Sequence, residues 1–156
     1  PLLLSEKSNL FKLFLSDVGM LTTMYGRATK IKILNGDKDI NNGALYENAV
    51  AQELYAHGYK PYYFNSKKQG ELDFLIEYHG EILPIEVKSG KGYTVHSALN
   101  NVLSNEDYSI KQAFVFANCN VTINEKILYY PIYFCMFLQE RDLILPKIPK
   151  VDFSQM

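Results

Sequence analysis

The alternation of apolar and other residues along the chain is clearest between positions 70 and 90. Two short segments there, 71–78 and 81–88, place an apolar side chain at nearly every second position, which is typical of a β-strand with one buried face. His79 and Gly80 separate the segments, and a two-residue connection containing Gly is typical of a tight turn. The pattern therefore predicts an antiparallel β-hairpin.

The position of this turn fixes which residues of the two strands face each other. With the two turn residues at the tip, Asp73 lies opposite Glu86, and Glu71 lies opposite Lys88. Because side chains alternate between the two faces of a strand, all four charged residues are expected on one face. The core-facing surface is expected to consist of Leu72, Phe74, Ile76, Leu83, Ile85 and Val87. A register slip of one residue would move a whole strand to the opposite face.

Other stretches predict the elements around the hairpin. Asn41 and Asn42 offer an N-cap for a helix over 43–57, which Gly58 can end. The aromatic-rich segment 59–65 predicts a strand that leads to the hairpin. The remaining predictions are a short strand or the start of a helix over 9–16, a helix from Ser16 or Asp17 to about Tyr25, a loop over 27–40, a helix over 94–103, a polar loop over 104–108, a buried strand over 110–117, a further strand over 123–130, a terminal helix over 131–139 and a tail rich in Pro and Lys.

The size and composition of the chain are those of one globular domain. Its 156 residues are 47% hydrophobic and 21% charged, which is enough apolar material for a proper core. A formal charge of −1 excludes a global basic field, so nucleic-acid binding would require a local patch. The longest apolar run, residues 127–138, contains Pro131 and is too short to span a bilayer. We expect one domain over residues 1–156, with its core over 9–138 and no membrane span.

The two cysteines bear on the compartment. Cys119 and Cys135 lie in apolar contexts and lack metal-ligand spacing. They are interpreted as buried free thiols in a reducing cytosol, the alternatives being a disulfide or a reactive thiol. The chain opens without Met and shows no signal peptide. These features favour a cytoplasmic protein that is a fragment of a longer chain.

The paired carboxylates of the hairpin are the first candidate for chemistry. Like charges directly opposed across a sheet are destabilising, by about 0.2–1 kcal/mol for an exposed pair. A bound divalent cation would explain why Asp73 and Glu86 are tolerated together, and oxygen ligands without Cys or His suit Mg²⁺ or Mn²⁺. The alternative is a solvated face in which Glu71 pairs with Lys88 and Asp73 points to water.

Glu47 is a third candidate carboxylate. Val50, Ala51 and Leu54 follow it at three, four and seven residues, so Glu47 is expected along the inward side of the predicted helix. A buried carboxylate is costly unless it is paired or binds a metal. The alternative is a residue at the edge of the apolar stripe that reaches solvent or accepts a hydrogen bond.

Other motifs add less. Lys67 and Lys68 lie in the turn before the hairpin and Lys91 lies just after it, so these three lysines are candidates for phosphate contact, although turn lysines also serve solubility. The segment 89–92 lacks the spacing of a phosphate-binding loop. The histidines, His57, His79 and His96, are scattered and do not indicate a hydrolase triad.

The order of these motifs resembles a known superfamily. A helix with Glu47, then E-x-D at 71–73, then I-E-V-K at 85–88 is similar to the PD-(D/E)XK nucleases. More closely, four segments of the chain resemble the DUF4143 domain. They are K-L-F-L-S-D-V-G-M-L (12–21), G-A-L-Y-E-N-A-V-A-Q-E-L (43–54), G-E-L-D-F-L-I (70–76) and L-P-I-E-V-K-S-G (83–90).

This resemblance implies a fold, a partner and a site. The fold implied is an α/β restriction-endonuclease-like core, a mixed central sheet flanked by helices, at the C-terminus of a P-loop (AAA-type) ATPase of bacteria and archaea. By match, Asp73, Glu86 and the carbonyl of Val87 would hold Mg²⁺ or Mn²⁺, Lys88 would be the catalytic lysine, and Glu47 would hold a second metal or a water. Leu72 stands where these nucleases usually have Pro, and no Gln motif is evident after Lys91.

The function expected from these residues is that of a metal-dependent DNA phosphodiesterase. A second hypothesis is a non-cleaving interaction or regulatory domain that keeps the fold and binds a protein or nucleic acid. The near-neutral charge favours this second hypothesis, whereas the complete set of three carboxylates and a lysine favours the first.

Overall fold

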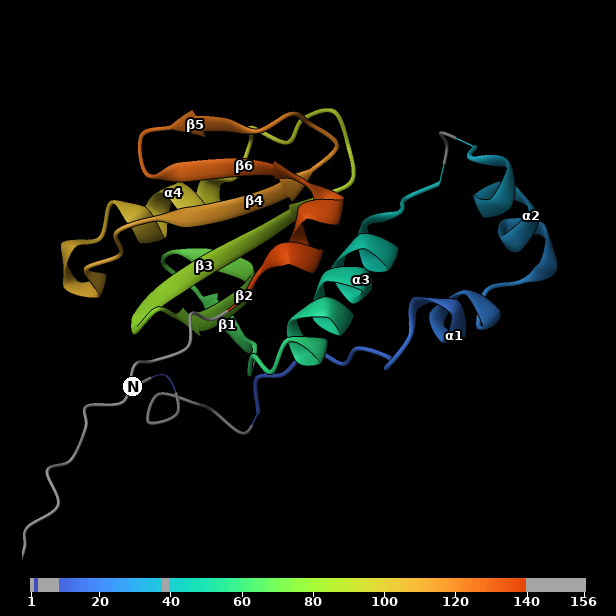
Figure 1. The fold of residues 1–156 in the computed structure, drawn as a ribbon, viewed down its shortest axis with the longest axis horizontal. Helices are drawn as coiled ribbons and strands as arrows, with labels where there is room; N and C mark the ends of the chain where they lie inside the picture. The colour runs from blue at the N-terminus through green and yellow to red at the C-terminus, as the bar shows by residue number, and fades with distance from the viewer. Residues whose placement is uncertain (1, 3–8, 38–39, 140–156) are drawn as a thin grey trace, which may run out of the picture.

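The fold is built on one six-stranded sheet with helices packed against it (Figure 1). The computed structural model describes residues 2, 9–37 and 40–139. The strands are β1 (Tyr62–Ser66), β2 (Gly70–Tyr78), β3 (Glu81–Lys88), β4 (Ala113–Ala117), β5 (Thr122–Asn124) and β6 (Ile127–Pro131). The α-helices are α1 (Val18–Thr23), α2 (Arg27–Asn35), α3 (Gly43–Ala56) and α4 (Ser97–Leu103), and the 3₁₀ helices are η2 (Glu106–Tyr108) and η3 (Ile132–Phe137).

The sheet is mixed, as the sequence predicts. Its strand order is β1-β2-β3-β4-β6-β5. The pairs β1–β2, β2–β3 and β5–β6 are antiparallel, while β3–β4 and β4–β6 are parallel. Parallel neighbours require a crossover connection, and the chain between β3 and β4 supplies it through α4.

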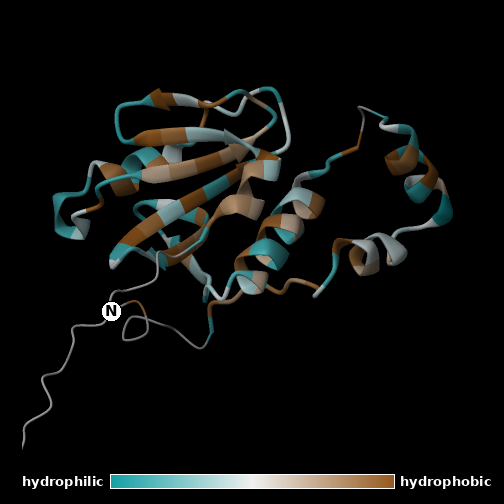
Figure 2. Cartoon of the chain, in the orientation of Figure 1, coloured by the Kyte–Doolittle hydropathy of each residue, from teal (hydrophilic) through white to brown (hydrophobic). Residues whose placement is uncertain are grey.

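The two faces of the sheet carry separate hydrophobic clusters. The α3-side cluster has as its buried members Val50, Ala51, Leu54, Tyr59, Phe74, Ile76, Leu83, Ile85, Val87, Phe114, Phe116, Cys135 and Leu138. The α4-side cluster has Leu72, Leu75, Leu99, Val102, Ile110, Ala113, Val115, Ala117, Ile127 and Tyr129. Strand β4 alternates between the two clusters and is buried throughout, as expected of a strand covered on both faces, and Figure 2 shows the apolar colouring of the central strands.

The predicted hairpin is confirmed. Strands β2 and β3 pair from Phe74↔Ile85 to Tyr78↔Glu81, in the register that the turn position predicts. His79 and Gly80 both have positive φ angles, 52° and 77°, which is the backbone of a type I′ hairpin turn. Glycine accepts this conformation without steric cost.

A bulge changes the predicted core face of β2. The register of β1 against β2 shifts so that two residues of β2, Asp73 and Phe74, lie opposite the single residue Tyr63. Leu72 consequently packs in the α4-side cluster, while Phe74 packs on the α3 side. The prediction that Leu72 shares a face with Phe74 is therefore wrong, and the extra residue at the bulge is the reason. The predicted common face of Glu71, Asp73, Glu86 and Lys88 assumed that side chains alternate strictly along β2, and the bulge interrupts this alternation.

Other predicted elements need correction. Residues 9–16 form neither strand nor helix, and the predicted loop over 27–40 contains α2. The segment 123–130 holds parts of two antiparallel strands rather than one, because Glu125 turns the chain with a φ of 53°. The terminal helix is the shorter 3₁₀ helix η3, and the Pro- and Lys-rich tail from residue 140 onward lies outside the described residues.

Helices α1 and α2 lie beyond α3, away from the sheet (Figure 1). Neither helix has a buried residue. The side chain of Asp17 caps α1 as predicted, by accepting a hydrogen bond from the backbone N–H of Met20 at 3.0 Å. Across the described parts of the chain, no helix is both long and apolar enough to cross a membrane.

Candidate functional site

The candidate carboxylates gather where β2 begins and β3 ends. Because these strands are antiparallel, Glu71 and Asp73 of β2 lie at the same end of the sheet as Glu86 and Lys88 of β3. Helix α3, which packs on β3 and η3, brings Glu47 to the same end. Three elements that are separate in the sequence thus supply the predicted residues.

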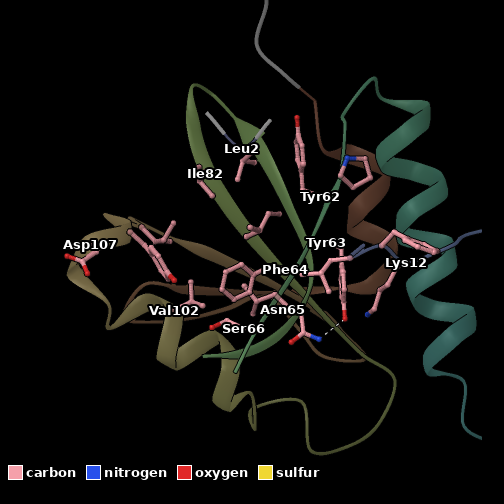
Figure 3. Close-up of a pocket in the computed structure, with 17 residues that line it drawn as sticks. Leu2, Lys12, Tyr62, Tyr63, Phe64, Asn65, Ser66, Ile82, Val102 and Asp107 are labelled. Carbon is pink, nitrogen blue, oxygen red and sulfur yellow. Dashed lines mark hydrogen bonds between the residues drawn. The ribbon is translucent and has the colours of Figure 1, made fainter. Parts of the chain in front are cut away.

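The centre of the acidic group is occupied by Lys12. Its Nζ lies 3.2 Å from Oε2 of Glu47, 3.0 Å from Oε1 of Glu71 and 3.0 Å from Oδ1 of Asp73. The ammonium also lies 5.5 Å from the ring centroid of Tyr63, the residue opposite the bulge. Figure 3 shows Lys12 beside Tyr63. One lysine therefore neutralises part of the charge that three carboxylates create.

The backbone of the Lys12 segment is fixed to α3. Asn48, which is 2% exposed, accepts a hydrogen bond from the N–H of Leu15 at 2.8 Å and donates one to the carbonyl oxygen of Leu15 at 3.1 Å. Phe14 packs its ring on Phe74, with 5.2 Å between the centroids. The sequence analysis missed both Lys12 and Asn48. A signal that could have pointed to this contact is the position of Asn48 three residues before Ala51, on the apolar side of the predicted helix.

Asp73 ends the ladder between β2 and β3. The backbone pairs stop at Phe74↔Ile85, and the N–H of Val87 donates instead to Oδ2 of Asp73 at 2.8 Å. The N–H and C=O of one residue in an extended strand point to the same side. The carbonyl of Val87, which the family resemblance implies as a metal ligand, is therefore directed toward β2 at the place where the backbone pairing of the two strands stops.

Glu86 and Lys88 form a pair beside this group. Nζ of Lys88 donates to Oε1 of Glu86 at 2.6 Å. The other oxygen, Oε2 of Glu86, is buried and has no hydrogen-bond partner among the described residues, and Glu86 as a whole is only 7% exposed. An unpaired buried carboxylate oxygen is costly, so a cation or a hydrogen-bond donor at this atom would stabilise the folded chain.

The surroundings shift the pKa values of these groups in opposite directions. Burial, followed by repulsion from Asp73, raises the pKa of Glu86 above its ordinary value, and the same two causes raise the pKa of Glu47. The hydrogen bond from Lys12 lowers the pKa of Glu71. Burial alone would lower the pKa of Lys12, but the adjacent carboxylates outweigh it and raise that pKa, so Lys12 stays protonated.

Neutralising Glu86 is expected to stabilise the metal-free protein near neutral pH. Because the pKa of Glu86 is raised in the folded chain, the folded state holds this proton more tightly than the unfolded state, and stability falls as pH rises through the folded pKa. Glu86→Gln removes this loss and keeps an acceptor for Lys88. It should raise the free energy of unfolding at about pH 7 by about 0.2–1 kcal/mol, with no gain below the ordinary glutamate pKa of about 4.3.

Thermal melts at the two pH values measure this effect. Glu77→Gln is the matched control, because it makes the same change at an exposed glutamate on β2, the strand that pairs with the strand of Glu86. A lower melting temperature for Glu86→Gln at neutral pH would show that the pair with Lys88 outweighs burial and repulsion, contrary to the expectation.

The candidate phosphate-binding lysines surround the same end of the sheet. Lys67 and Lys68 lie in the turn before β2, and Lys91 follows β3; all three are exposed. That turn is anchored to α4, where the side-chain amide of Asn101 donates to the backbone carbonyl of Gln69 at 3.1 Å. The lysines are thus placed near the carboxylates but in solvent, which fits phosphate contact and solubility equally.

The histidine His96 and the two cysteines lie away from the carboxylates, in surroundings that indicate a role in the fold. His96 is buried, with Nε2 2.7 Å from the hydroxyl of Tyr129 and Nδ1 3.1 Å from Oδ1 of Asn100. Cys119 and Cys135 are free thiols, as the sequence predicts, but only Cys135 is buried, whereas Cys119 is half-buried. Burial raises the pKa of Cys135 to about 11. A thiol with so high a pKa is a poor nucleophile.

A cavity of about 620 Å³ opens next to Lys12 (Figure 3). It is lined mainly by aromatic and aliphatic side chains of β1, β2, η2 and the Lys12 segment, including Tyr62, Phe64 and Tyr108. Lys12 borders it, but none of the candidate carboxylates does. Glu47 instead borders a smaller cavity of about 280 Å³ between the Lys12 segment and α3. The carboxylates and the 620 Å³ cavity are therefore separate features that meet at Lys12.

Comparison with known protein families identifies a match. The family described as "Domain of unknown function (DUF4143)" matches residues 42–134, which is more than half of the chain. The chain belongs to the DUF4143 family. Comparisons with curated proteins and with solved structures found no match.

The first and last residues of the DUF4143 match show which site residues belong to the family region. It runs from the start of α3 into η3 and includes Glu47, Asp73, Glu86 and Lys88. Lys12 lies outside it, as does the segment 12–21 that resembles the opening of the domain. The carboxylates therefore belong to the matched DUF4143 region, and the ammonium that neutralises them is contributed by the chain that precedes it.

Proposed function

We propose that this chain is a metal-dependent DNA phosphodiesterase module with a restriction-endonuclease-like (PD-(D/E)XK) core. The observation that carries the proposal is the buried Oε2 of Glu86, which has no partner among the described residues and belongs to a carboxylate that Asp73 repels. A cation between these two residues would remove both costs. Support also comes from the sequence order of Glu47, Asp73, Glu86 and Lys88.

The donor set fits a magnesium-type ion. Asp73 and Glu86 offer carboxylate oxygens, and Val87 offers a backbone carbonyl on the same side. Mg²⁺ is commonly held by one or two carboxylates together with water and phosphate, whereas an all-protein cage is unusual. Among the described residues no three His, Cys, Asp or Glu side chains are arranged to hold a metal by themselves, so water and phosphate would have to complete the coordination.

Each residue has a distinct part in this proposal. When bound, Mg²⁺ or Mn²⁺ would lower the pKa of a coordinated water and stabilise charge on the phosphate. Lys88, fixed by Glu86, can orient that water or neutralise charge that develops on the phosphate oxygens. Asp73 also holds the N–H of Val87 and so fixes the separation of the two strands. Exposed Lys67, Lys68 and Lys91 would contact the DNA backbone.

The proposal is tested by a cleavage assay. Plasmid, linear and single-stranded DNA are incubated with the chain and Mg²⁺ or Mn²⁺, with EDTA as the control. Metal-dependent cutting is the expected result. If no substrate is cut, by the chain alone or together with the P-loop ATPase domain that we propose precedes it, the nuclease proposal fails.

A second candidate is a non-cleaving interaction domain of such an ATPase. The observation that favours it is the arm formed by α1 and α2, which has no buried residue and exposes Met20, Met24 and Leu34. The salt dependence of binding separates the two candidates. An affinity for DNA that falls steeply with salt indicates phosphate contacts, whereas an affinity for the ATPase domain that is insensitive to salt indicates an apolar protein interface.

A further inference from the structure

Lys12 is the most highly coordinated charged group at the site. Its ammonium contacts Glu47, Glu71 and Asp73 at 3.0–3.2 Å, and its side chain is only 22% exposed. These contacts span long stretches of sequence, 35 residues to Glu47 and 61 residues to Asp73. An isolated surface ion pair is weak, but one cation shared by three carboxylates forms a network. The position of the Lys12 ammonium is therefore determined by the tertiary structure and is not that of a freely moving surface lysine.

The segment that carries Lys12 is held by contacts independent of charge. Asn48 makes two hydrogen bonds to the backbone of Leu15, and Phe14 packs on Phe74. The ammonium is thus delivered to the carboxylates by a backbone that is already fixed, so this contact does not require the segment itself to be ordered.

The charges around Lys12 and Glu86 do not cancel. When all groups are ionised, the four carboxylates of Glu47, Glu71, Asp73 and Glu86 face the two ammonium groups of Lys12 and Lys88, which leaves a net charge of −2. One divalent cation balances this charge. Asp73 divides the site: Lys12 lies against its Oδ1, whereas the unpaired oxygen of Glu86 belongs to the part of the site that Lys12 does not contact.

We propose that Lys12 is a positioning residue that takes the place of a second divalent ion at this site. It holds Glu47, Glu71 and Asp73 together, so the site accepts one divalent cation, on the side of Glu86. Glu47 then serves as a ligand of Lys12 and not of a metal. This inference rests on the proposed metal site. It adds that the site binds one metal ion and that the ammonium of Lys12 supplies the positive charge that a second ion would otherwise provide.

Mn²⁺ binding to the whole chain tests the inference without an activity assay. The EPR signal of free Mn²⁺ is followed during titration of the wild type, Lys12→Met, Lys12→Arg and Lys32→Met. Lys32→Met is the matched control, because it removes a lysine from the exposed helix α2. We expect one bound ion for the wild type, Lys12→Arg and Lys32→Met. Lys12→Met should bind two ions, the second at least about tenfold more tightly than any further ion on the wild type, since its three carboxylates have lost their cation.

A structural role of Lys12 alone would change melting temperatures and not the number of ions. Melting curves of the metal-free variants therefore accompany the titration, and Lys12→Arg checks that a cation at this position restores the wild-type number. Two ions on the wild type, or the same number on wild type and Lys12→Met, would overturn the inference and leave the metal site standing. No ion on the wild type would overturn both the inference and the proposed metal site. If Lys12→Met does not fold, the number of ions on the wild type and Lys12→Arg decides.

Discussion

Replacing Asp73 by Asn is expected to reduce metal-dependent DNA cleavage by about 10²–10³-fold or more while the protein stays folded. The substitution removes the charge that would hold the cation. It keeps an oxygen in place that can accept the hydrogen bond from the N–H of Val87. Rates of plasmid cleavage in Mg²⁺ measure the loss, and melting curves measure the fold. Because the substitution changes the charge and keeps the shape of the side chain, the cleavage rate should fall while the melting temperature stays close to that of the wild type.

The matched control is again Glu77→Gln on the same strand. Glu77 is exposed and lies four residues from Asp73, so its neutralisation should leave the cleavage rate within about twofold of the wild type. Severe unfolding of Asp73→Asn would show that this carboxylate is a structural residue that holds β2 and β3 together. Full activity in the folded variant would remove Asp73 from the site.

Replacing Phe74 by Ala should cost about 3–5 kcal/mol of the free energy of unfolding. Phe74 is 1% exposed and is among the largest fully buried side chains of the described residues. It lies in the bulge, beneath Phe14 of the Lys12 segment. Truncation leaves a cavity and also removes the contact of that segment. The expected loss is a large part of the stability of an ordinary domain, about 5–15 kcal/mol.

Chemical denaturation of Phe74→Ala and of Ile123→Ala measures this effect. Ile123 lies on β5 and is 70% exposed, so its truncation should change stability by no more than about 0.5 kcal/mol. A loss below about 1 kcal/mol for Phe74→Ala would mean that the α3-side cluster collapses around the gap or that the Lys12 segment is not held there.

The hairpin and α3 are predictable from sequence because their signals are local. His79-Gly80 permits one tight turn, and the turn position then fixes the register of every following pair. The dense apolar residues of α3 follow a helical period and end at Gly58, whose φ is +82°. Neighbouring residues therefore carry most of the information needed for these elements.

Helix α2 is missed for the opposite reason. None of its residues is buried, so the apolar period that identifies a packed helix is absent. Its end at Gly36, with a left-handed φ of 68°, is the one local signal present. The segment 123–130 is misread because a turn at Glu125 does not contain the usual Gly.

The candidate site is predictable in part. The pattern of the hairpin identifies Asp73, Glu86 and Lys88, and the helical period adds Glu47. The bulge cannot be derived in this way, because it depends on how β1 packs against β2. Lys12 escapes detection for a similar reason: its contact with Asp73 spans 61 residues, and its place at the start of the segment 12–21 does not indicate a partner in the hairpin.

The sequence separation between Lys12 and the hairpin has a consequence for the order of folding. Hairpin contacts are local and form within microseconds in isolated peptides, whereas closing a long loop carries an added entropic cost. We therefore expect the acidic end of the hairpin to form before the ammonium of Lys12 arrives. During that interval Glu71 and Asp73, and Glu47 once α3 has packed, repel one another without the cation that they share, so this step is a barrier that dissolved salt can lower. Refolding that accelerates with added salt in both the wild type and Lys12→Met, with a gain in folded-state stability in Lys12→Met alone, would reveal this late neutralisation.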